Sequence, residues 1–108
     1  MGRKGRDKYF YVAKGVKSDS KLTPLKGHPN TNIDRYRKND GKFISRRKID
    51  NHGNACIDLD IGHNGGVDHV HYIDTNKTPP RSTEHAKPTK KQAAELKKAK
   101  KKRKFWNV

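Results

Sequence analysis

Cysteine, acidic residues and long apolar stretches are all scarce in this chain of 108 residues. The one cysteine, Cys56, excludes an internal disulfide framework and a structural zinc site built from several thiolates. No apolar run approaches the length of a membrane span or of a signal-peptide core. We therefore expect no membrane insertion. If the protein leaves its cell, we expect a larger parent protein or a dedicated machine to carry it.

Apolar residues are few as well, at 29% of the chain, while charged residues make up 35%. This balance is close to that of disordered chains. The apolar residues are, however, concentrated between Tyr9 and Tyr72 and then nearly vanish until Phe105. We therefore predict four parts: a basic N-terminus over 1–8, a compact core over 9–74, a proline-containing linker or strap over 75–87, and a basic helix or tail over 88–108.

Acidic residues do not balance the basic ones, since 27 Lys and Arg stand against 11 Asp and Glu and leave a net charge of +16. The electrostatic field of so positive a chain attracts nucleic-acid phosphates, anionic membranes or an acidic protein partner. Nucleic acid is the commonest of these partners, and a simple solubilising excess of charge is the alternative. The basic residues that we expect to contact nucleic acid are Arg47, Lys48, Arg81, Lys97, Lys98 and Lys101.

Four segments carry strand patterns. The run 9–13 is rich in aromatic residues, and 42–50, 55–61 and 69–73 each follow a turn signal rich in glycine and asparagine. Residues 51–54 have the composition of a hairpin loop that joins the second segment to the third. The stretch 15–32 is predicted as a loop and 33–38 as a short helix or turn.

Thr89 and Gln92 have the spacing of a capping box, which predicts a helix from Lys90 to about Arg103. Its apolar stripe is thin, so we expect RNA or another protein to complete its folding. The segments together predict an α+β fold, in which a small twisted antiparallel sheet is accompanied by a basic C-terminal helix or tail.

Five titratable residues that suit chemistry lie within fourteen residues: Asp58, Asp60, His63, His69 and His71. Alternate residues of a strand project from the same face, so the two aspartates share a face and so do His69 and His71. Antiparallel pairing of the two segments would bring these four side chains together on the water-facing side of the sheet, provided that the register is as expected.

This set suits metal-independent cleavage of RNA. Such cleavage needs a base for the 2′-hydroxyl proton, an acid for the leaving oxygen and cations around the phosphate. Histidine exchanges protons near neutral pH, so His63, His69 and His71 are the candidate acid and base. Either aspartate would orient an imidazole, and Arg46 on the partner strand would supply positive charge. This reaction requires no cofactor.

Two alternatives stay open. The first is metal-dependent hydrolysis of phosphodiesters, as in a DNase, with Asp58, Asp60, His69 and His71 as ligands. The second is a module without enzymatic activity that binds RNA or DNA through phosphates and stacks bases on its tyrosines and tryptophan.

The order of motifs between Arg46 and Arg81 resembles the small C-terminal modules of bacterial polymorphic toxins, including contact-dependent inhibition and Rhs-type effectors. The resemblance covers a third of the chain, and the motifs that carry it are Asp58-Leu59-Asp60, His63, His69-Val70-His71 and Pro79-Pro80-Arg81. Two features depart from the family pattern. The aromatic residue expected shortly after His-x-His is absent, and the basic tail beyond Pro88 lies outside the resemblance.

The resemblance implies a ribonuclease toxin that cleaves tRNA or rRNA in competitor bacteria. It implies delivery as part of a larger effector, action in the target-cell cytoplasm as a monomeric domain, and neutralisation by an acidic immunity protein. It also implies a fold similar to that of barnase, EndoU, colicin and RelE toxins. By position, it assigns the site to Asp58, Asp60, His63, His69, His71 and Arg81.

Overall fold

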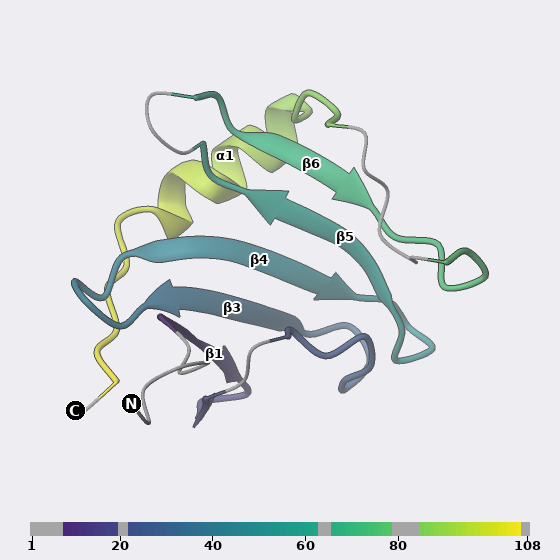
Figure 1. Ribbon diagram of the computed structural model, residues 1–108. Coiled ribbons are helices and arrows are strands. Elements are labelled where there is room, and N and C mark those ends of the chain that lie inside the picture. The colour runs from purple at the N-terminus through teal and green to yellow at the C-terminus, as the bar shows by residue number, and fades with distance from the viewer. Residues whose placement is uncertain (1–7, 20–21, 63–65, 79–84, 107–108) are drawn as a thin grey trace.

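The computed structural model describes residues 8–19, 22–62, 66–78 and 85–106 and contains one antiparallel sheet with one helix behind it (Figure 1). Six strands lie in the order β2-β1-β3-β4-β5-β6. Their bounds are β1 Tyr9–Ala13, β2 Val16–Ser18, β3 Asn32–Arg37, β4 Phe43–Ile49, β5 Ala55–Asp60 and β6 His69–Tyr72, and the helix α1 spans Lys90–Ala99. The predicted α+β class is confirmed at this coarse level.

The four predicted strand segments all form strands, but the segments at 15–32 and 33–38 differ from prediction. A short strand, β2, follows a tight turn at Lys14 and Gly15, which both have positive φ as a two-residue hairpin turn requires. The predicted helix or turn over 33–38 is wrong, because these residues form β3. Ile33 and Tyr36 have helix-like spacing, yet each is buried in a different apolar cluster of the sheet. Pairing with a strand on each side overrides the weak local preference.

The main core lies between the sheet and α1. It contains Phe10, Tyr36, Phe43, Leu59, Val70, Leu96 and Ala99. A smaller cluster of Ile33, Ile49 and Ala55 lies toward the β4–β5 hairpin. The helix is therefore part of the folded unit rather than an appendage, although its sequence is dominated by lysine.

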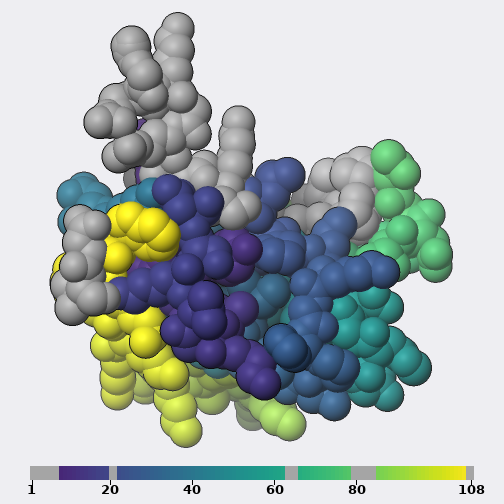
Figure 2. Space-filling model, turned by 90° about the horizontal axis from the view of Figure 1, so that it is seen from below, coloured from purple at the N-terminus to yellow at the C-terminus, as the bar shows by residue number. Residues whose placement is uncertain are grey.

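The predicted start of α1 is confirmed, because Thr89 and Gln92 form the reciprocal hydrogen bonds of a capping box. The helix ends at Ala99, earlier than predicted, and the chain then turns back along the sheet. Lys104 N–H donates to the Gly41 carbonyl, and the Trp106 ring packs on Phe10. From below, the yellow C-terminal segment lies beside the purple residues of the first two strands (Figure 2).

Ion pairs hold α1 to the sheet as well. Arg46 donates to Asp34 and to Glu95 of the helix, and Lys48 donates to both oxygens of Glu95. Burial raises the pKa of Glu95, but the hydrogen bonds from these two cations outweigh it and lower the pKa overall. Hydrogen bonding to Asp34 likewise raises the pKa of Arg46 against the effect of burial. The described part of the chain contains no helix that could span a membrane.

Candidate active site

The register of β5 and β6 brings the two motifs together. Asp58 pairs with His71, and Asp60 pairs with His69. The alternating residues Leu59 and Val70 are fully buried in the core beneath α1, so the acids and imidazoles lie on the opposite face of the sheet. The predicted common face is therefore confirmed.

This face is less accessible to water than the sequence predicts. Asp58 and His71 are each only 5% exposed, and Asp60 is 9% exposed. The reason is that segments distant in the sequence pack near these strands. The loop near Thr23 is bound to Arg47 of the neighbouring strand β4, and the segment at His85 packs on His71 from the open edge of β6.

His85 joins the cluster from a segment that the sequence predicts to be a linker. Its ring stacks on His69 with centroids 4.2 Å apart and an interplanar angle of 8°, and it meets His71 edge-on at 4.7 Å. Reciprocal hydrogen bonds of 2.9 Å between Ala86 and Val70 position this segment along the open edge of β6. Sequence reasoning missed His85, because residues 75–87 carry no periodic pattern. A further histidine in the chain was the only available signal.

Asp60 lies between two of these rings. Its Oδ2 is 3.4 Å from Nε2 of His69 and 3.5 Å from Nε2 of His71. On the other side of its ring, His69 Nδ1 lies 3.2 Å from the Val67 carbonyl. A carbonyl oxygen only accepts hydrogen bonds, so Nδ1 is the donor in this contact, and Nε2 lies on the side of the ring that faces the carboxylate.

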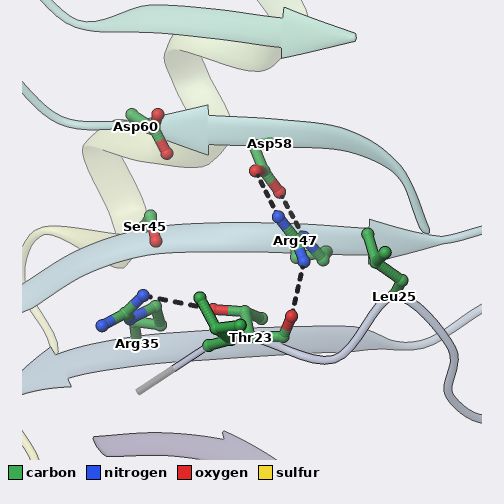
Figure 3. Close-up of a pocket in the computed structure, with 8 residues that line it drawn as sticks. Thr23, Leu25, Arg35, Ser45, Arg47, Asp58 and Asp60 are labelled. Atoms are coloured by element: carbon green, nitrogen blue, oxygen red, sulfur yellow. Dashed lines mark hydrogen bonds and ion pairs between the residues drawn. The ribbon is translucent and has the colours of Figure 1, made fainter. Parts of the chain in front are cut away.

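Asp58 has a different role from Asp60. Arg47 donates from Nε and Nη2 to the two oxygens of Asp58, both at 2.8 Å, and from Nη1 to the Thr23 and Pro24 carbonyls. Figure 3 shows this fork-to-fork pair and its contact with the loop. The bidentate pair positions the guanidinium, and its third nitrogen binds the loop to the sheet, so Asp58 and Arg47 stabilise the framework around the site. Beside them lies a cavity of about 270 Å³, and Asp60 and Ser45 belong to its lining.

The structure separates Arg46 and Lys48 from the cluster. Both project to the α1 side of the sheet, because they alternate with Arg47 along β4, and both are paired with Glu95 there. The prediction that Arg46 supplies charge to the reacting phosphate is therefore wrong. Lys48, which we predicted to contact nucleic acid, is also engaged on this side, because its ammonium group is paired with Glu95.

The other predicted site residues are distributed as follows. His63 and Arg81 lie outside the described residues. Lys97, Lys98 and Lys101 are exposed on α1 and directly after it. They belong to the opposite side of the molecule from Asp58 and Asp60, so they are available for phosphate contacts away from the histidine cluster.

A broad open depression adjoins the cluster at the edge of the sheet. It has a volume of about 920 Å³, and its lining includes His69, His85, Lys87 and Lys100. Lys100 Nζ lies 2.6 Å from Asp68 Oδ2, while the Gly62 N–H donates to the same side chain. Burial raises the pKa of Asp68, but these two hydrogen bonds lower it overall. Asp68 thereby ties the segment before β6 to the end of α1.

The arrangement can support two kinds of chemistry. Imidazoles in contact with a carboxylate, beside an open depression, can transfer protons to and from a bound substrate. Alternatively, His69, His71 and His85 offer ring nitrogens that all lie within 4.8 Å of one another, which suits a metal ion. Comparison of the chain with models of protein families, with curated proteins and with solved structures finds no match.

Proposed function

We propose that the protein is an endoribonuclease that cleaves RNA without a metal ion, as the polymorphic-toxin motifs in its sequence suggest. The observation that carries the proposal is the contact of one carboxylate, Asp60, with the imidazoles of His69 and His71, while His85 stacks on His69. A chain with a net charge of +16 adds a general attraction for phosphate backbones.

In the proposed reaction, one imidazole accepts the proton of a ribose 2′-hydroxyl. The 2′-oxygen then attacks the adjacent phosphorus, and the bond from phosphorus to the 5′-oxygen breaks. A second imidazole donates a proton to that leaving oxygen. The products are a 2′,3′-cyclic phosphate and a 5′-hydroxyl, and the proton balance is closed.

Exposure divides the roles among the histidines. His85 is exposed and the His69 side chain is 17% exposed, and both line the open depression, so these two rings are the ones that reach substrate. The His71 side chain is only 6% exposed, so it does not reach substrate and acts as a positioning residue packed beside Asp60. Lys87, exposed in the same depression, is suited to contact the phosphate.

The toxin context remains part of the proposal. Delivery within a larger effector, action in the cytoplasm of a target bacterium and neutralisation by an immunity protein rest on the resemblance alone. An immunity protein for this chain should be acidic, because a partner that covers so basic a surface must complement its charge.

Incubation of the tag-free protein with total RNA and with plasmid DNA, both in EDTA, tests the proposal. RNA should be cut into fragments that end in cyclic phosphates, while the DNA should stay intact because it lacks the 2′-hydroxyl. A His69→Ala variant should lose about 10²- to 10⁴-fold in rate, as expected for loss of a proton-transfer group. The matched control is His52→Ala, at an exposed turn. Intact RNA, or equal rates for the His69→Ala variant and the parent, would reject the proposal.

A further inference from the structure

The distances around Asp60 are unusual for hydrogen bonds. The N···O separations of 3.4 and 3.5 Å to His69 and His71 exceed the usual 2.7–3.2 Å of an N–H···O bond. In a tetrahedral zinc site, with bonds of about 2.0–2.2 Å, two neighbouring ligand atoms are separated by about 3.4 Å. The carboxylate and each imidazole are thus spaced as two ligands of one metal ion.

From this spacing, we propose that His69, His71, His85 and Asp60 form a binding site for a divalent transition-metal ion of the zinc class. The three imidazoles supply ligand atoms that lie within 4.8 Å of one another. The widest pair of imidazole nitrogens would need to close by up to about 1.4 Å to match a tetrahedral edge. His85 is exposed and lies on a loop, so it is the ligand best able to make that adjustment.

The surroundings of His69 support a metal ligand. The contact of Nδ1 with the Val67 carbonyl fixes the ring orientation and leaves Nε2 directed toward Asp60. In metal-binding histidines, the N–H of the second ring nitrogen commonly donates a hydrogen bond to a backbone carbonyl in this way, which sets the tautomer and strengthens the ligand.

The charge of the protein does not forbid a cation here. Two basic groups on neighbouring elements are already paired, Arg47 with Asp58 and Lys100 with Asp68. Asp60 brings one negative charge to the site itself. The open depression lined by His69 and His85 gives an ion a route from solvent. Imidazole with one carboxylate favours zinc, cobalt or nickel over magnesium or calcium, which prefer oxygen ligands.

The proposed metal site does not require the protein to be a ribonuclease. The effect of the metal on RNA cleavage, however, rests on that proposed function. An ion held by these nitrogens would occupy the lone pairs that accept protons in the metal-free reaction. Zinc should therefore inhibit RNA cleavage, which would make the site sensitive to metal availability.

The test is a titration of the tag-free, EDTA-stripped and dialysed chain with Co²⁺, followed by visible absorption, and with Zn²⁺, followed by calorimetry. We expect one ion per chain and the absorption bands of tetrahedral cobalt. His85→Gln and Asp60→Asn should each weaken binding at least tenfold, whereas His52→Gln, the matched control, should bind as the parent does. Because His85 is exposed, its variant should keep the circular dichroism spectrum of the parent.

Absence of saturable binding would overturn the metal site, as would equal affinity of the parent and a folded His85→Gln variant. These measurements can reject the metal site or the ribonuclease activity independently of each other. Tetrahedral cobalt binding by a chain that leaves RNA intact in EDTA would reject the ribonuclease and keep the metal site. Cleavage in EDTA by a chain that binds no cobalt would do the reverse. Activation by zinc, with no activity in EDTA, would keep the site and reject the metal-free mechanism.

Discussion

Replacement of Leu96 by alanine should test whether the lysine-rich helix is an integral part of the fold. Leu96 is 1% exposed and belongs to the core cluster with Leu59 and Val70, directly behind the strands that carry the site. A polyelectrolyte tail that folds only on RNA would tolerate the change. A helix that contributes Leu96 and Ala99 to the core would not.

The expected cost follows from the burial of this side chain. Truncation of a fully buried leucine to alanine removes its transfer free energy and leaves a cavity, at a cost of about 2–5 kcal/mol. A domain of this kind has a free energy of unfolding of about 5–15 kcal/mol, and a small sheet should lie near the lower bound. A loss of about 3 kcal/mol would lower Tm by about 12–24 °C, since 1 kcal/mol shifts Tm by about 4–8 °C in a domain of this size.

Urea and thermal unfolding, followed by circular dichroism, measure this loss. The control is Lys91→Ala in the first turn of the same helix, where the exposed side chain should change stability by no more than about 0.5 kcal/mol. Equal stability of the Leu96→Ala and Lys91→Ala variants would refute the reasoning, because it would mean that α1 does not bury Leu96 in solution.

Two more predictions concern charge. The pKa of Glu95 is lowered in the folded protein from an ordinary value of 4.5, so this residue contributes stability above that pH and loses it as the pH falls through the lower, folded value. Urea melts between pH 3 and pH 7 should therefore show a flatter dependence for Glu95→Gln than for the parent, and parallel curves would contradict the prediction. Replacement of Lys98 and Lys101 by alanine should weaken RNA binding and reduce the slope of log K against log[salt] by about 1.4 for single-stranded RNA. Fluorescence anisotropy at several salt concentrations measures that slope, and an unchanged slope would exclude these lysines from phosphate contacts.

The shared face of the site could be predicted from residue order, because the side-chain period of a strand is two. Along one strand, Asp58 and Asp60 alternate with Leu59, and along the next, His69 and His71 alternate with Val70. Because Leu59 and Val70 must be buried, the acids and imidazoles must occupy the opposite face of the sheet. The capping box at Thr89 was equally visible, since it depends only on contacts across one helical turn.

The difference between the two aspartates could not be predicted in this way. Both lie on the same face of β5, but Asp58 meets Arg47 of the neighbouring strand while Asp60 meets the imidazoles. Arg46 and Arg47 are adjacent in the chain and chemically alike, and strand geometry sends them to opposite faces. Local sequence carries no information about which cation will find which acid across a sheet.

What the sequence alone determined is therefore periodic and local: four of the six strands, the face that each alternating residue of the site occupies, the start of the helix and the strong positive charge. Tertiary structure alone decided how segments distant in the chain meet. It placed His85 against β6 through two backbone hydrogen bonds at Ala86, and it inserted Leu96 into the core. The first outcome arises because the backbone groups at an open sheet edge need hydrogen-bond partners, and the second because an apolar sheet face must be covered. Any segment that can reach the edge or the face can fill these roles, so strand and helix patterns do not specify which one does.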